Sequence, residues 1–156
     1  MKNMSKSAVL AGHLSKMMQD LSIATSQYMI IAGYCLHKMR EVSDLDVLIN
    51  HSSYLKLKKS GLAVVDIAKI SKKERLVVNL PDGLEIEFFS TKYTPGFPSA
   101  EYSIKNLRKE KRLDYDKFGN AYFNIETCIK QYSDIVKRDG KYLSLIHISE
   151  PTRRYA

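Results

Sequence analysis

The sequence has few cysteines and no long apolar segment. Its 156 residues include two cysteines, Cys35 and Cys128, which are too few for a disulfide framework or a zinc cluster. A reducing, cytoplasmic compartment is therefore the expected location. No apolar run approaches the roughly 18 residues of a membrane-spanning helix, so no membrane partner is expected. His13, Lys16 and Asp20 interrupt the apolar part of the N-terminal segment, which argues against a secretory signal.

Internal repeats and low-complexity linkers are also lacking, and the length suits one domain with a core of its own. A content of 44% hydrophobic and 27% charged residues is typical of a soluble globular protein. The 25 basic and 17 acidic residues give a net charge of +8, which favours polyanionic partners such as nucleotides or nucleic acid. The lysines are spread along the chain, so an evenly solvated basic surface explains the charge equally well.

The segment 143–153, LSLIHISEPTR, resembles the translated read-through of a common DNA-sequencing library adapter. We therefore expect residues 1–142 to form a single domain that lacks its native C-terminal end, and residues 143–156 to be an artefactual tail. His147 is accordingly excluded from the candidate ligands and bases. The alternative interpretation is a native amphipathic tail.

Hydrophobic periodicity and turn residues predict an α+β domain with a mixed, largely antiparallel sheet and flanking helices. The predicted helices cover residues 7–22, 34–40, 51–61, 100–110 and 125–138. The predicted strands cover residues 27–33, 44–50 and 62–70, and two hairpins cover residues 74–90 and 112–125. The first hairpin turns at a Pro-Asp-Gly sequence and the second at Phe-Gly-Asn.

Two aspartates, Asp44 and Asp46, open the predicted strand 44–50. Residues two apart on a strand point to the same face, so their like charges repel one another unless a cation lies between them. Carboxylate oxygens suit a divalent metal. The preceding strand ends at Gly33, where the missing Cβ lets the backbone approach a bulky anion, and a following helix would offer free N–H groups to phosphate. This pattern places a phosphate site beside a metal site.

These residues resemble the nucleotidyltransferase superfamily of the DNA polymerase β type. The family pattern is an apolar residue, Gly, then Gly or Ser, a spacer of about ten residues, and an Asp-apolar-Asp/Glu-apolar sequence. Gly33, the spacer 35–43 and the sequence from Asp44 to Val47 fit this pattern. The sequence RxxSDLD, from Arg40 to Asp46, is similar to the form seen in minimal nucleotidyltransferases. The similarity covers roughly residues 27–90.

The resemblance implies a nucleotidyltransferase-like fold and a site with two Mg²⁺ ions held by Asp44, Asp46 and a third carboxylate. The sequence LEIEFFS offers Glu85 and Glu87, which share one face of a predicted strand. We favour Glu87, with Glu85 as the open alternative. The family activity is in-line attack of a hydroxyl on the α-phosphorus of a nucleoside triphosphate, with Glu87 drawing the proton and pyrophosphate leaving. The implied acceptor is an RNA end, a protein side chain or a small molecule.

Tyr34 stands where the family has its second small residue, which lies against the triphosphate. Its ring either crowds the triphosphate or turns away and leaves the backbone N–H to serve. Arg40 and Lys38 are candidates for triphosphate contact, or for helix-end cations that offset the helix dipole. Ser43 either binds phosphate or a metal-bound water, or caps the turn into the strand.

Three functional hypotheses follow from these residues. The first is a Mg²⁺-dependent nucleotidyltransferase with a nucleoside triphosphate as substrate. The second is a catalytically weakened nucleotide- or RNA-binding module in which Tyr34 fills the triphosphate site. The third is an antitoxin-type interaction protein with the same fold. The oligomeric state and the preferred base are not predicted by any of these patterns.

Overall fold

The computed structural model describes residues 5–69, 72–93 and 103–139. The helices of this part are α1 (Lys6–Asp20), α2 (His51–Ser60), α3 (Ile104–Lys109) and α4 (Ile125–Asp139). The 3-10 helices are η1 (Thr25–Gln27), η2 (Ala32–Leu36) and η3 (Pro81–Gly83). The strands are β1 (Tyr28–Ile31), β2 (Asp44–Ile49), β3 (Val64–Ile67), β4 (Glu74–Asn79), β5 (Glu85–Ser90), β6 (Leu113–Tyr115) and β7 (Ala121–Phe123). The predicted tail 143–156 lies outside the described residues.

The strands form one seven-stranded sheet in the order β3-β4-β5-β2-β1-β7-β6. The pairings β2 with β5 and β1 with β7 are parallel, and the remaining pairings are antiparallel. This arrangement confirms the expected α+β class with a mixed, largely antiparallel sheet. Among the described helices, none combines the length and apolar character that crossing a bilayer requires.

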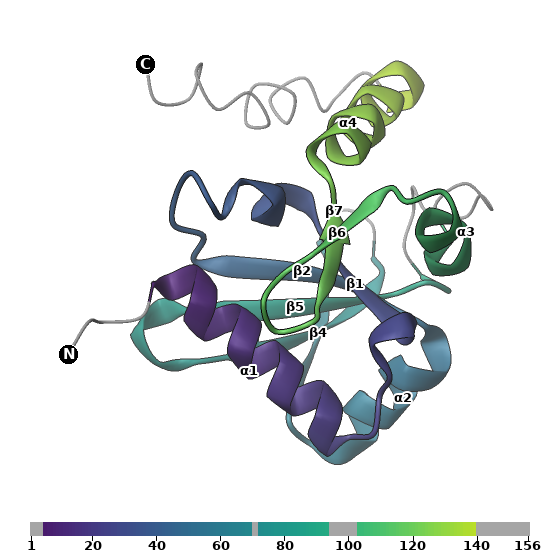
Figure 1. The fold of residues 1–156 in the computed structure, drawn as a ribbon. Helices are drawn as coiled ribbons and strands as arrows, with labels where there is room; N and C mark the ends of the chain where they lie inside the picture. The colour runs from purple at the N-terminus through teal and green to yellow at the C-terminus, as the bar shows by residue number, and fades with distance from the viewer. Residues whose placement is uncertain (1–4, 70–71, 94–102, 140–156) are drawn as a thin grey trace.

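Hydrophobic side chains form two cores on the two faces of the sheet. Figure 1 shows α1 lying across the sheet and α4 well away from α1. One face packs against α1 and α2 through a core that includes Leu10, Leu14, Tyr54, Leu57, Ile86 and Phe88. The other face packs against α3 and α4 through a smaller core that includes Met29, Leu48, Leu107, Phe123 and Cys128. The smaller core covers only part of its face, which leaves the first residues of β2 and β5 outside it.

Both predicted hairpins are present, and residues with positive φ form their turns. Asp82 and Gly83 have φ of 64° and 74° in the turn between β4 and β5, and Gly119 has φ of 88° between β6 and β7. In the second turn, Asp116 accepts hydrogen bonds from the backbone N–H groups of Phe118 and Asn120. The sequence therefore identified the turns from residue types that tolerate left-handed backbone.

The predicted two-turn helix over 34–40 is wrong, because the segment is the 3-10 helix η2 followed by a turn. In a 3-10 helix, side chains three residues apart eclipse each other. The rings of Tyr34 and His37 accordingly stack at 4.3 Å with an interplanar angle of 3°. The helix predicted over 100–110 is shorter, since α3 covers Ile104–Lys109 with Ser103 as its N-cap. Residues 100–102 lie outside the described part.

Candidate active site

Four carboxylates lie side by side on two neighbouring parallel strands. In the register of β2 and β5, Asp44 is paired with Glu85 and Asp46 with Glu87. The intervening Leu45 is 1% exposed and points into the larger core, so the four acids share the opposite face. We call Asp44, Asp46, Glu85 and Glu87 the acid cluster. The structure thus brings both predicted pairs of acids together from segments far apart in the sequence.

Two members of the acid cluster have raised pKa values. Burial and the neighbouring charge of Asp44 raise the pKa of Asp46 to about 6. Burial, a hydrogen bond with Glu85 and the charge of Asp46 raise the pKa of Glu87 to about 7. Ionising both groups is costly because desolvation and like charges act in the same direction. The acid cluster therefore favours a cation near Asp46 and Glu87.

Arg75, on β4, provides one such cation. Its Nη1 donates to Glu87 Oε2 at 2.9 Å and its Nε donates to Asp66 Oδ2 at 2.7 Å. Within the residues that the structure describes, no three His, Cys, Asp or Glu side chains converge in a group that could hold a metal ion. The guanidinium of Arg75 therefore lies beside Glu87, the residue predicted as the third metal ligand. Arg75 was not among the predicted site residues, although its place on the strand paired with β5 offers a signal.

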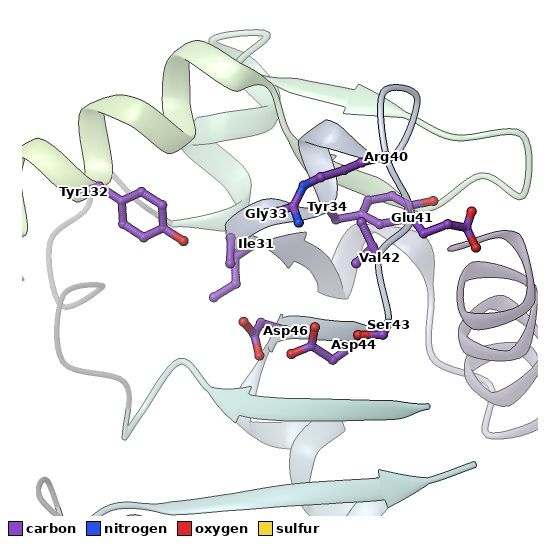
Figure 2. A pocket seen from close by; sticks show the side chains of 11 residues that line it. Ile31, Gly33, Tyr34, Arg40, Glu41, Val42, Ser43, Asp44, Asp46 and Tyr132 are labelled. Carbon is purple, nitrogen blue, oxygen red and sulfur yellow. The ribbon is translucent and has the colours of Figure 1, made fainter. Parts of the chain in front are cut away.

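A cavity of about 380 Å³ opens above the two aspartates (Figure 2). Asp44 and Asp46 point into it from β2, and Ser43 lies at its rim. Gly33 and Arg40 line the opposite side. We call this space the acid cavity. A ligand in it would contact carboxylates on one side and a backbone turn with a guanidinium on the other.

Arg40 lies directly against the turn that carries Gly33. A Cβ added at Gly33 would stand 3.4 Å from Arg40 Nη2, in contact with the end of that side chain. The preceding residue, Ala32, has φ of 60°, a left-handed conformation that non-glycine residues rarely adopt. This local strain occurs at the point where β1 ends and the wall of the acid cavity begins. The predicted positions of Gly33 and Arg40 beside the aspartates therefore agree with the structure.

The ring of Tyr34 turns away from the aspartates, which is one of the two arrangements left open by the sequence (Figure 2). Its hydroxyl donates to Asp116 Oδ2 at 2.9 Å, and its ring meets Tyr122 edge-on at 5.2 Å between centroids. The residue is only 3% exposed. Tyr34 thus packs between η2 and the hairpin of β6 and β7, and it also lines part of the acid cavity.

Lys38 does not line the acid cavity. Its side chain is exposed and borders a second cavity of about 370 Å³, which is also lined by His37 and Lys117. The predicted contact of Lys38 with triphosphate therefore has no support from its position. The structure adds Tyr132, whose hydroxyl points from α4 toward the acid cavity (Figure 2). No sequence signal distinguished Tyr132 from the other residues of its amphipathic helix.

Arg75→Gln is expected to destabilise the protein by roughly 1–2 kcal/mol at pH 8, because Glu87 then lacks its counter-ion. The expected loss of stability is moderate because the Arg75 side chain is 31% exposed. The pKa of Glu87, already about 7, rises further without Arg75. An acid with a raised pKa destabilises the fold above that pKa, where it is ionised, and this destabilisation disappears as the acid takes up a proton. The loss should therefore shrink at pH 5, as measured by urea unfolding at both pH values.

Lys58→Gln is the matched control, because it removes a cation from Glu74 in another ion pair. Hydrogen bonds from Tyr54 and Lys58 lower the pKa of Glu74 below its ordinary value, so this group stays ionised from pH 5 to 8. The loss of stability caused by Lys58→Gln should be nearly the same at both pH values. A pH-independent loss in Arg75→Gln would contradict the assigned charge balance.

Comparison with known proteins gives no relative: no protein-family model, no curated protein and no solved structure matches this chain.

Proposed function

We propose that this protein is a Mg²⁺-dependent nucleotidyltransferase that moves a nucleoside monophosphate from a nucleoside triphosphate to a hydroxyl acceptor. The observation that carries the proposal is the parallel register that pairs Asp44 with Glu85 and Asp46 with Glu87 beside the acid cavity. Phosphoryl transfer depends mainly on positioning and on neutralising the charge of the phosphate oxygens. A carboxylate pair facing a turn with a cationic side chain provides the groups for both tasks.

Asp44 and Asp46 are the residues that would hold magnesium. Their oxygens are the hard donors that Mg²⁺ prefers, and this ion commonly uses one or two carboxylates together with substrate phosphates. A ready-made site with three acids is therefore not required. When bound, Mg²⁺ would neutralise charge on the phosphates and help to orient the reacting groups.

Glu87 is the residue that would accept the proton of the attacking hydroxyl. A general base works best when its pKa lies near the working pH, and the pKa of Glu87 is about 7. The acceptor oxygen would form a bond to the α-phosphorus while the bond to the leaving pyrophosphate breaks. Glu87 Oε2 accepts a hydrogen bond from Arg75, so Oε1 would be the oxygen that takes the proton.

Gly33 and Arg40 would contact the triphosphate from the opposite side of the acid cavity, and Ser43 would contact it from the rim. The guanidinium of Arg40 offers several N–H donors, which suits phosphate oxygens. The missing side chain of Gly33 allows the backbone to come close. The acceptor remains open among an RNA end, a protein side chain and a small molecule.

A nucleotide-binding module without transfer activity is the second candidate. The pairing of Arg75 with Glu87 favours it, because a guanidinium already neutralises the proposed base. In this case the protein would bind nucleoside triphosphate through Arg40 and the two aspartates without reacting.

Label transfer distinguishes the two candidates. The protein is incubated with α-³²P-labelled nucleoside triphosphates, Mg²⁺ and cell extract, and acid-stable label is followed on RNA, protein and small molecules. The nucleotidyltransferase proposal predicts label on one acceptor class in the wild-type reaction and loss of that label in Asp46→Asn. Binding of triphosphate without transfer under all conditions would contradict the proposed enzyme and support the binding module.

A further inference from the structure

The two cysteines of the chain pack in one core cluster although they are far apart in the sequence. Cys35 is half-buried in η2, and Cys128 is 1% exposed in the first turn of α4. The thiol of Cys128 donates to the carbonyl oxygen of Ala32 at 3.3 Å. Cys35 packs against the same core cluster, which includes Cys128. Two thiols from different elements that pack in one cluster are candidates for a covalent cross-link.

The two thiols differ in exposure, since Cys35 is half-buried and Cys128 is 1% exposed. A hydrogen bond from Cys128, together with the positive charge of Arg40, lowers the pKa of Cys35. Its hydrogen bond to Cys35 and its burial raise the pKa of Cys128. The thiolate is the reactive form of cysteine, and Cys35 is also the more exposed of the two. We therefore expect an oxidant to react with Cys35 first, and Cys128 to provide the second thiol.

We propose that Cys35 and Cys128 form a peroxide-sensitive pair that closes a disulfide between η2 and α4. The Cys35 thiolate attacks one oxygen of hydrogen peroxide, the O–O bond breaks, and the departing hydroxide takes a proton to become water. Cys35 is then a sulfenic acid. Cys128 gives up its proton and attacks the Cys35 sulfur, and the hydroxyl group leaves as a second water. Two thiols are oxidised by two electrons, and one peroxide is reduced to two waters.

This disulfide would join two walls of the acid cavity. The turn of η2 supplies Gly33 to that cavity, and Tyr132 lines it from one helical turn beyond Cys128. The cross-link would thus hold the position of α4 against the turn. It would also close a long loop of the chain, which restricts the unfolded state. The thiol chemistry does not depend on the proposed transfer activity.

The test begins with the reduced wild-type protein exposed to hydrogen peroxide, then denatured and alkylated. The expected result is the loss of two hydrogen atoms from the intact mass and no alkylated thiol. Proteolysis without reductant should release one cross-linked peptide containing Cys35 and Cys128, and dithiothreitol should reverse the change. The oxidised protein should also unfold at a higher temperature than the reduced protein.

Two variants test the order of the steps. In Cys128→Ser, a sulfenic acid on Cys35 should be trapped by dimedone, whereas in Cys35→Ser the thiol of Cys128 should stay reduced at the same peroxide concentration. Two alkylated thiols in the peroxide-treated wild type, a sulfinic acid on Cys35 in place of the cross-link, or disulfides between chains only would overturn the proposal. The wild-type measurement does not require either variant to fold.

Discussion

Asp46→Asn is expected to lower the rate of nucleotidyl transfer by about 10²–10³-fold, the scale typical of removing one preorganised electrostatic group from an active site. Asp46 lies between Asp44 on its own strand and Glu87 on the neighbouring strand, and it points into the acid cavity. Asparagine keeps the shape of the side chain and removes its charge. The rate of label transfer from α-labelled nucleoside triphosphate at saturating Mg²⁺ measures this effect.

The same substitution should stabilise the metal-free protein at pH 8. The pKa of Asp46 is raised to about 6, so its ionised form destabilises the fold above that pH. Allowing for solvent screening, the expected gain is about 1–2 kcal/mol, and it should vanish near pH 4. Asp20→Asn removes the same charge from an exposed position at the end of α1 and should change neither property. A stable Asp46→Asn protein with wild-type transfer would contradict the proposed role of Asp46.

Tyr34→Ser is expected to destabilise the protein by about 3–5 kcal/mol, as large-to-small substitutions of buried aromatic residues do. The ring of Tyr34 packs on His37 at 4.3 Å and on Tyr122 at 5.2 Å, and its hydroxyl binds Asp116. Serine would leave a cavity between η2 and the hairpin of β6 and β7. The loss is a large part of the stability of an ordinary domain, and urea unfolding measures it.

Two control substitutions separate the contributions to this effect. Tyr34→Phe keeps the ring and removes the hydrogen bond to Asp116, so it should cost roughly 1–2 kcal/mol. Tyr115→Ser removes a tyrosine that is 53% exposed and should cost well under 1 kcal/mol. If Tyr34 instead filled the triphosphate site, Tyr34→Ser would leave stability nearly unchanged and would tighten nucleotide binding.

Local patterns were sufficient to predict most elements and both acid pairs. The period of two along a strand places Asp44 with Asp46 and Glu85 with Glu87, each pair on one face. Glycine and aspartate are residue types that tolerate positive φ, and their presence in the sequence predicted the hairpin turns where the structure has positive φ. These features depend on residues close together in the sequence, so they can be read without a structure.

Contacts between distant segments could not be predicted in this way. The parallel pairing of β2 with β5 joins strands separated by two others in the sequence, and their register decides which acids face each other. The partner of Tyr34 is Asp116, 82 positions away, and no local pattern indicates that the ring turns toward it. Arg75 donates a hydrogen bond to Glu87 because the antiparallel register of β4 and β5 places the two residues diagonally across the strands. Each of these contacts is set by packing of the whole sheet.

The central claim is that Asp44 and Asp46 bind a divalent metal. Equilibrium titration with Mn²⁺, followed by loss of the free-ion EPR signal and by competition with Mg²⁺, tests it directly. Wild type and Asp20→Asn should bind Mn²⁺ at pH 8, and Asp46→Asn should bind it with an affinity at least about 10-fold lower. Binding should be weaker at pH 5, where Asp46, with its pKa of about 6, is mostly protonated. Equal binding by wild type and Asp46→Asn, or no binding by wild type at pH 8, would contradict it.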